Sequence, residues 1–175
     1  MGNSVQRGGD LDRGLNILGR RMDACWRLFY RLAYRAARLW WAIRRPAATA
    51  ANTAIWCEDR LLLLTTSYRP GWHFPGGFVH KGEDPRAAAI RETLEEVGID
   101  LAAASLSAAI VVKCRYEGRM DTNYIFEVQI PAPGPLQIDN REIVGAAYLT
   151  LAEAMSRPAI PVVRTYLERR AGASR

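Results

Sequence analysis

The chain of 175 residues is 49% apolar and 24% charged, which suits one well-buried globular domain with an extension. Its net charge of +6 belongs to residues 1–46, which carry ten Arg and three Asp, whereas residues 47–175 carry fourteen Lys or Arg and fifteen Asp or Glu. Three widely spaced cysteines without a CxxC pair argue against a disulfide framework or a zinc site, and they favour a reducing compartment.

The extension, residues 1–46, is predicted to form a long basic amphipathic helix from about residue 11 to residue 44. Apolar residues recur in alternating steps of four and three, as in a heptad seam: Leu11, Leu15, Leu18, Met22, Cys25, Phe29, Leu32, Ala36, Leu39 and Ile43. The positions beside the seam hold apolar residues such as Trp26 and Trp40 in place of complementary charges, so the apolar face is wider than a coiled coil needs. The other face is basic: Arg13, Arg20, Arg27, Arg31 and Arg38.

A helix of this kind is typical of a segment that lies in a membrane interface. The same pattern would also suit packing onto its own domain or onto a partner subunit, including a second copy in a homodimer, so residues 11–45 keep all three alternatives. No apolar run reaches the roughly 18 to 20 residues of a transmembrane helix, and Arg residues interrupt any secretory signal. The expected location is the cytoplasm, with attachment to the inner face of a membrane as an alternative.

Pro46 is expected to end this helix, and the second part of the chain, residues 47–175, is expected to form the main domain. Two strands are predicted at Thr53–Cys57 and Leu61–Thr66, and the second is apolar enough to be buried on both faces. In the loop that follows, Trp72 is a candidate for stacking on a base, although such aromatics more often fill a core. Arg69 is a candidate phosphate ligand.

A helix is predicted next, because Asp84 can cap it, Pro85 fits its first position and Gly98 fits its end. One apolar stripe is expected to face the core: Ala87, Ile90, Leu94 and Val97. Three carboxylates fall together on the opposite side at 100° per residue: Glu92, Glu95 and Glu96.

Carboxylates grouped on one turn repel one another, so the grouping does not stabilise the helix. Hard divalent ions such as Mg²⁺ take oxygen ligands, and they commonly bind through a few carboxylates together with substrate phosphates. A solvated acidic face with Arg91 paired to Glu95 is the alternative on the helix alone. The Gly-rich approach at residues 75–82, where backbone can come close to a ligand, favours the metal site.

The residues around this helix stand at fixed spacings. Gly77 is followed after five residues by Glu83, and after seven more by the run RETLEEVGI, Arg91 to Ile99. This pattern resembles the box of the Nudix hydrolases at every fixed position. The one departure is Thr93, where the family has a bulky aliphatic residue, and it concerns packing rather than chemistry. With the flanking strand pattern, the resemblance covers roughly residues 47–170.

Beyond the box, strands are predicted at 108–116, 122–130 and 142–149, followed by a short helix that Thr150 caps and a final helix at 161–170. Strands with helices on either side in the sequence fit an α/β fold. The resemblance implies a Nudix-type α/β/α sandwich with a mixed sheet, preceded here by the long N-terminal helix.

The resemblance also implies site roles. Glu92, Glu95 and Glu96 match the carboxylates that hold Mg²⁺, with Mn²⁺ as an alternative, and Gly76 matches a position whose backbone carbonyl often joins them. Relatives take a further carboxylate from beyond the box, for which Glu142 is the best candidate. Its competitors are Glu117, Asp121 and Asp139. Glu95 and Glu142 are the two candidate general bases. With Glu96, they make up the expected catalytic residues.

The implied reaction is Mg²⁺-dependent cleavage of a phosphoanhydride bond in a nucleoside diphosphate linked to another group, such as a nucleoside triphosphate or a dinucleoside polyphosphate. Tyr116 lies near the place where diadenosine-polyphosphate relatives carry a Tyr, so it joins the candidate substrate contacts. The expected partner is a phosphorylated small molecule, and no sequence-specific nucleic acid is expected. The alternative is a membrane- or partner-docked module of the family that mainly binds, but the complete set of box glutamates argues against it.

Overall fold

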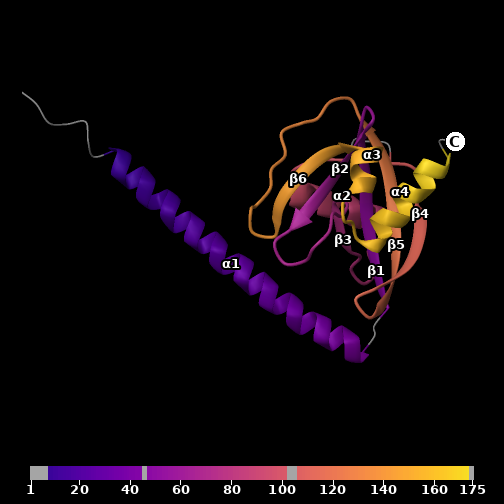
Figure 1. Ribbon diagram of the computed structural model, residues 1–175, viewed down its shortest axis with the longest axis horizontal. Helices are drawn as coiled ribbons and strands as arrows, with labels where there is room; N and C mark the ends of the chain where they lie inside the picture. Colours follow the sequence, from indigo (N-terminus) through magenta and orange to yellow (C-terminus); the bar gives the residue numbers. More distant parts are fainter. Residues whose placement is uncertain (1–7, 45–46, 102–105, 174–175) are drawn as a thin grey trace, which may run out of the picture.

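The computed structural model describes residues 8–44, 47–101 and 106–173, with side chains of the first range described from residue 22 to residue 41. The predicted helix end at Pro46 and the side chains of the seam before Met22 lie outside the described residues. The elements in chain order are α1 (Gly8–Arg44), β1 (Ala48–Cys57), β2 (Arg60–Thr66), β3 (Gly76–Phe78), α2 (Pro85–Val97), β4 (Ile110–Tyr116), β5 (Arg119–Ile130), β6 (Ile143–Thr150), α3 (Leu151–Ser156) and α4 (Pro161–Ala173) (Figure 1).

A mixed sheet forms the centre of the domain, as the resemblance implies. It has six strands: the five that are predicted and the short β3, which is not. Its order is β4-β5-β1-β2-β6, and the short β3 pairs with β1 beside this path. β1 runs parallel to β5 along its whole length, whereas the other pairs are antiparallel. The parallel pairing lies at the centre of the sheet, so polar residues of β1 and β5 are brought next to one another.

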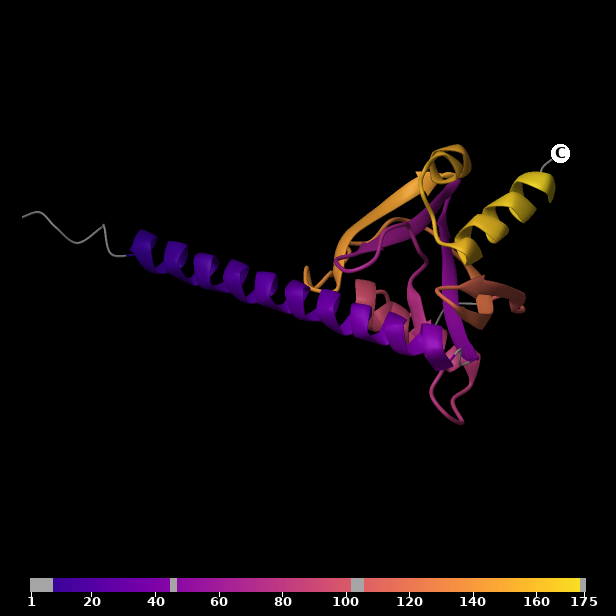
Figure 2. The same ribbon diagram turned by 60° about the horizontal axis from the view of Figure 1, so that its bottom comes forward.

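Helices cover both faces of the sheet (Figures 1 and 2). On one face, α3 and α4 pack over a core that includes Leu61 and Leu63 of β2. On the other face, α2 packs over a core that includes Leu62 and Leu64. All four leucines are fully buried, which confirms that β2 is covered on both faces.

The predicted apolar stripe of α2 is right for Val97, which is buried, and for Ile90, which packs against the core. It is wrong for Ala87 and Leu94, which face solvent; Leu94 is 49% exposed. The buried residues of α2 are Ala88, Ala89, Thr93 and Val97. Two small alanines let the helix approach the sheet closely. The buried hydroxyl of Thr93 donates to the Ala89 carbonyl at 2.7 Å and lies 2.8 Å from the Thr53 hydroxyl, so its burial leaves no unpaired polar group.

α1 lies across the domain and continues beyond it (Figures 1 and 2). The structure shows a helix in this position, as predicted. Across the residues that the structure describes, no helix is both long and apolar enough to cross a bilayer.

His73 predicts how stability depends on pH. The ring is fully buried, its Nδ1–H donates to the Phe74 carbonyl, and burial lowers its pKa from 6.5 to about 3. The unfolded chain therefore binds one more proton than the folded chain below pH 6.5, so His73 removes about 1.4 kcal/mol of stability per pH unit between 6.5 and about 3. Urea unfolding of wild type and His73→Asn at pH 7.5 and about pH 4.5 measures this slope.

The slope should be smaller in His73→Asn, whatever the stability of that variant at neutral pH. His80→Gln is the matched control, because the His80 side chain is 70% exposed. An equal slope in wild type and His73→Asn would contradict the prediction.

Candidate active site

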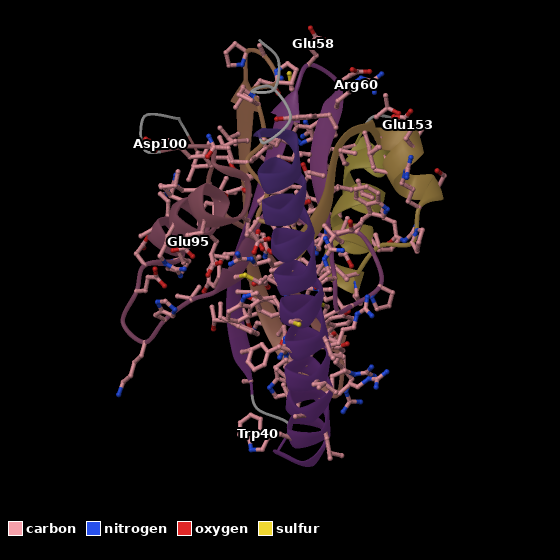
Figure 3. All side chains as sticks on the ribbon, turned by 90° about the vertical axis from the view of Figure 1, so that its left-hand side faces the viewer. Trp40, Glu58, Arg60, Glu95, Asp100 and Glu153 are labelled. Carbon is pink, nitrogen blue, oxygen red and sulfur yellow. The ribbon has the colours of Figure 1, made fainter. Side chains whose placement is uncertain are left out.

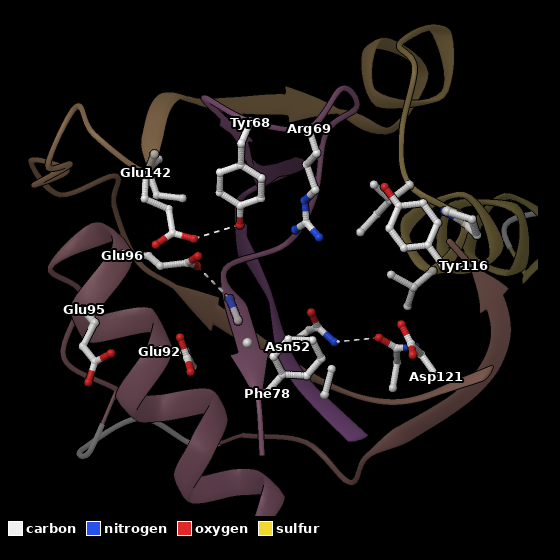
Figure 4. Close-up of a pocket in the computed structure, with 18 of the residues that line it drawn as sticks. Asn52, Tyr68, Arg69, Phe78, Glu92, Glu95, Glu96, Tyr116, Asp121 and Glu142 are labelled. Atoms are coloured by element: carbon white, nitrogen blue, oxygen red, sulfur yellow. Dashed lines mark hydrogen bonds between the residues drawn. The ribbon is translucent and has the colours of Figure 1, made fainter. Parts of the chain in front are cut away.

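A pocket of about 390 Å³ opens where α2, β3 and the central strands meet (Figure 4). α2 supplies carboxylates to one end of it, and the β4-β5 hairpin forms the other end. The loops after β2 and before β6 close its rim. Its polar lining residues include Asn52, Tyr68, Arg69, Glu92, Glu95, Glu96, Tyr116, Arg119, Asp121, Asn123, Asp139 and Glu142.

The three glutamates of α2 do not share one exposed face. Glu95 has a side chain that is 60% exposed at the edge of the pocket, whereas Glu96 points into the pocket (Figure 4). The backbone N–H of Gly76 donates to Glu96 Oε2 at 2.8 Å. Burial raises the pKa of Glu96 to about 8, and the charges of Glu92 and Glu142 add to this shift. The carboxylates therefore repel one another in a buried place that a cation would neutralise.

Two glycines of β3 stand in close contacts, Gly76 with the backbone of β1 and Gly77 with Glu92 of α2. A Cβ on Gly76 would lie 2.3 Å from the Ala51 carbonyl oxygen, and its φ of +146° also suits glycine. A Cβ on Gly77 would lie 2.4 Å from the carboxyl carbon of Glu92. Gly76 is required because any side chain there would collide with the β1 backbone, whereas a side chain at Gly77 would displace the Glu92 carboxylate from its place.

Arg91 ties the loop before α2 to the helix. Its Nε donates to Glu83 Oε1 at 2.9 Å, and its other nitrogens donate to Glu83 Oε2 at 3.1 Å and to Glu92 Oε1 at 2.7 Å. The hydrogen bonds from Arg91 lower the pKa of Glu83 to about 2. Arg91 Nη1 also lies 3.6 Å from Glu95 Oε2. The Arg91–Glu95 ion pair that a solvated acidic face would have is therefore present together with the bonds from Arg91 to Glu83 and Glu92.

Glu142 is presented to the pocket by a turn. The Asp139 carboxylate accepts from the backbone N–H groups of Arg141, Glu142 and Ile143, which fixes the chain just before β6. The Tyr68 hydroxyl donates to Glu142 Oε1 at 2.8 Å. Figure 4 shows Glu142 next to Glu96, so two carboxylates from different elements meet at one end of the pocket.

The competing carboxylates lie elsewhere. Glu117 accepts a hydrogen bond from Tyr34 and lies 3.5 Å from Arg38, and it is not among the lining residues. Asp121 lines the far end, where it pairs with Arg119 at 2.8 and 3.0 Å. Asp139 lines the pocket, but its side chain is occupied by the turn.

Of the candidate substrate contacts, Arg69 and Tyr116 line the pocket and Trp72 does not. Trp72 pairs with Ala159 in a short bridge, and its ring lies 5.2 Å from the Arg157 guanidinium. The Nε of Arg69 is buried and has no hydrogen-bond partner among the described residues. A phosphate oxygen is a suitable acceptor for such a donor.

Sequence reasoning missed the polar far end of the pocket. Asn52 of β1 donates to Asn123 of β5 at 3.4 Å, and both side chains are buried. An Asn in the middle of an apolar strand is the signal that was present, since buried amides need partners. Which strand lies beside which could not be read from the chain.

The residues at the near end fit a hard divalent ion. Within the described ranges, no three His, Cys, Asp or Glu side chains already converge as a metal cage. The available donors are nevertheless all carboxylate oxygens, from Glu92, Glu96 and Glu142, and the partly buried Glu96 carboxylate accepts a hydrogen bond from the Gly76 N–H. Oxygen donors of this kind suit Mg²⁺ or Mn²⁺ rather than a softer metal.

Comparison with known proteins shows which proteins this chain resembles. A family model described as NUDIX domain matches residues 46–169. A putative 8-oxo-dGTP diphosphatase of Bacillus subtilis is 35% identical over 93 residues, which are 53% of this chain and 59% of that protein. An RNA pyrophosphohydrolase of Roseobacter denitrificans is 62% identical over 29 residues, 17% of this chain and 18% of that protein. The chain thus spans less than two-thirds of the length of these curated relatives.

Solved structures share the fold. An Ap4A hydrolase of C. elegans superposes with a TM-score of 0.63 at 24% identity and covers 71% of this chain and 96% of its own. A MutT protein of Methanosarcina mazei superposes with a TM-score of 0.61 at 20% identity, and the match covers 75% of this chain and 97% of that protein. At these identities the likeness concerns the fold alone.

Proposed function

The chain belongs to the Nudix family, and from this we propose that it is a metal-dependent pyrophosphohydrolase that cleaves a phosphoanhydride bond in a nucleoside diphosphate derivative. The observation that supports this most directly is the partly buried Glu96 carboxylate, which accepts from the Gly76 N–H and lies close enough to Glu92 and Glu142 for their charges to raise its pKa. In this proposal residues 47–175 carry out the reaction and residues 1–46 form an extension. The expected location remains the cytoplasm.

Glu92, Glu95 and Glu96 would hold Mg²⁺ or Mn²⁺, with the Gly76 carbonyl as a further ligand. A divalent ion there would neutralise the diphosphate and lower the pKa of a bound water. Glu142 would accept a proton from the attacking water, with Glu95 as the other candidate base. The Tyr68 hydroxyl positions Glu142 for this step by donating to its Oε1.

The rest of the pocket would bind the phosphate groups and the base of the substrate through different residues. The buried Nε of Arg69 would donate to a phosphate oxygen, and Tyr116 would contact the group beyond it. The amides of Asn52 and Asn123, at the far end, offer both donors and acceptors to the edge of a base. We propose a nucleotide as the substrate class. The named relatives act on different nucleotides, so the leaving group is left to experiment.

A nucleotide screen tests this proposal. Purified full-length protein would be incubated with Mg²⁺ and a panel of nucleoside triphosphates, 8-oxo-dGTP, dinucleoside polyphosphates and 5′-triphosphorylated RNA, with product release measured by chromatography. Turnover of at least one compound that stops with EDTA and returns with Mg²⁺ is expected. Binding of nucleotides without any turnover in Mg²⁺ or Mn²⁺ would instead support the binding-module alternative.

Arg69→Gln should raise KM for the nucleotide by about 10- to 100-fold with a smaller effect on kcat. A hydrogen bond to a charged phosphate contributes roughly 1.5–3 kcal/mol, and Gln keeps a donor but not the charge. Steady-state kinetics measure both constants. Arg115→Gln is the matched control, because Arg115 is exposed and lies outside the pocket lining. A KM that stays at the wild-type value would remove Arg69 from the substrate contacts.

A further inference from the structure

The outer face of α1 carries large apolar side chains that the domain leaves uncovered. They belong to the heptad seam or stand beside it, and their exposed fractions run from 42% to 67%: Met22, Trp26, Leu28, Phe29, Leu32, Leu39 and Trp40. Single exposed apolar residues are ordinary, but a continuous face of this kind marks an interaction surface. In Figure 3, α1 passes in front of the domain, with Trp40 labelled near its end.

Polar and aromatic contacts hold the other face of α1 against the domain. The Nε groups of Arg27 and Arg31 donate to the backbone carbonyls of Asn140 at 2.8 Å and Ser67 at 3.0 Å. Asp23 pairs with Arg141 at 3.1 Å. These contacts act along the helix, so they fix its rotation as well as its position.

Aromatic rings complete the same inner face. The Tyr30 ring stacks on the Tyr68 ring, with their centroids 6.1 Å apart, and the Tyr34 ring lies tilted beside Tyr68, with their centroids 4.9 Å apart. Trp41 lies 3.8 Å from the Arg119 guanidinium. Positions 23, 27, 30, 34 and 41 therefore face the domain, at the three- and four-residue steps of one helix side. The described part of the seam faces away from it, so packing onto its own domain does not explain the seam.

We propose that the outer face of α1 docks onto an anionic lipid bilayer, with the helix lying flat in the headgroup region. Such helices combine a wide apolar face with cationic residues and bind more strongly to anionic than to neutral lipid. Trp26 and Trp40 suit this position, since an indole ring is apolar and its N–H can meet polar headgroups.

The charges favour a bilayer over a second copy of the chain. Residues 1–46 hold ten Arg and three Asp, with no Glu, so this segment as a whole is attracted to an anionic surface and offers few carboxylates to an identical partner. The positions that flank the seam, where a coiled coil places complementary charges, hold mainly Trp, Leu, Ala and Gly. Within the described side chains, Arg35 is exposed next to Leu28 and Leu39 on the helix, where it can reach lipid phosphates.

Vesicle co-sedimentation of the full-length protein tests the proposal. The probes are phosphatidylcholine vesicles with and without phosphatidylglycerol. Wild type should sediment with the anionic vesicles, and high salt should weaken this binding. Phe29→Glu combined with Leu32→Glu should reduce the affinity by at least about tenfold, because two apolar side chains that would insert into the bilayer are lost and two negative charges would face the lipid.

The matched control is Val111→Glu combined with Met120→Glu, which places the same charges on exposed apolar residues of the β4-β5 hairpin. It should bind vesicles like wild type, and both variants should keep the thermal unfolding midpoint of wild type. Wild type that sediments with neither vesicle would overturn the proposal, and so would equal sedimentation of wild type and the α1 variant.

The oligomeric state, measured by light scattering after size exclusion, distinguishes docking onto a bilayer from docking onto a second copy of the chain. A dimer that Phe29→Glu with Leu32→Glu dissociates, in a protein that binds no vesicles, would assign the face to a second copy and overturn the bilayer proposal. A monomer that binds anionic vesicles through this face supports it. Both measurements are independent of the hydrolytic activity.

Discussion

Glu96→Gln should lower Mg²⁺-dependent turnover by about 10³-fold or more while the protein stays folded. The loss of a carboxylate that neutralises and positions the ion removes several kcal/mol of transition-state stabilisation, and each 1.36 kcal/mol is a factor of ten in rate. Gln is nearly the same size as Glu, and its carbonyl oxygen can still accept the hydrogen bond from the Gly76 N–H. The backbone of β3 should therefore keep its place.

The stability of Glu96→Gln separates a chemical effect from a structural one. Burial raises the pKa of Glu96 to about 8, so the ionised form is disfavoured in the metal-free protein. Replacing it should leave the unfolding midpoint in EDTA unchanged or higher at pH 8.5, and should reduce the rise in midpoint that Mg²⁺ gives to wild type. Glu168→Gln, an exposed carboxylate of α4, serves as the control. Full activity in Glu96→Gln would show that the ion is held elsewhere.

The strands and the box helix could be predicted because their signals are local. The run of four leucines from Leu61 to Leu64 must be buried on both faces, and the structure places alternate leucines in two cores. Asp84, Pro85 and Gly98 define the ends of α2 by backbone chemistry that depends on neighbours only, and the Asp84 side chain accepts from the backbone of residues 86 and 87. Spacing alone also singled out Glu92 and Glu96, which line the pocket; their role as metal ligands stays a prediction.

The rotation of α2 could not be predicted, because it depends on how closely the helix approaches the sheet. Periodicity favoured Leu94 as a core residue, yet the two small residues Ala88 and Ala89 allow a closer contact, which turns Leu94 outward. Thr93, which departs from the family pattern, fits this contact because its hydroxyl finds partners within it. That rotation also carries Glu96 inward and leaves Glu95 in solvent.

The polar end of the pocket depends on long-range pairing. Asn52 and Asn123 come together only because β1 and β5 run parallel at the centre of the sheet, where Ala50 stands opposite Asn123 and Asn52 stands opposite Ile125. Likewise the heptad seam of α1 predicts an apolar face but not its direction. The contacts of Tyr30, Tyr34 and Trp41 with the domain show that this face turns away from it.

Glu142→Gln should lower kcat by about 10²- to 10⁴-fold, the usual contribution of a general base, with little change in KM. Gln keeps an oxygen that can accept from the Tyr68 hydroxyl, so the loop before β6 should stay in place. Glu117→Gln is the matched control, since Glu117 also follows a strand beyond the box but does not line the pocket. It should keep the wild-type kcat.

Two further variants decide what kind of role Glu142 has. Glu95→Gln tests the other candidate base, and Mn²⁺ affinity measured by electron paramagnetic resonance separates a lost ligand from a lost base. A large loss of kcat with unchanged Mn²⁺ affinity assigns the base to the residue that was replaced. Tyr68→Phe should give a smaller loss in kcat, about tenfold, because it removes the hydrogen bond that orients Glu142 but leaves the carboxylate. If Glu142→Gln turned over at the wild-type rate while Glu95→Gln did not, Glu95 would be the general base, and the hydrogen bond from Tyr68 to Glu142 would have no part in proton removal.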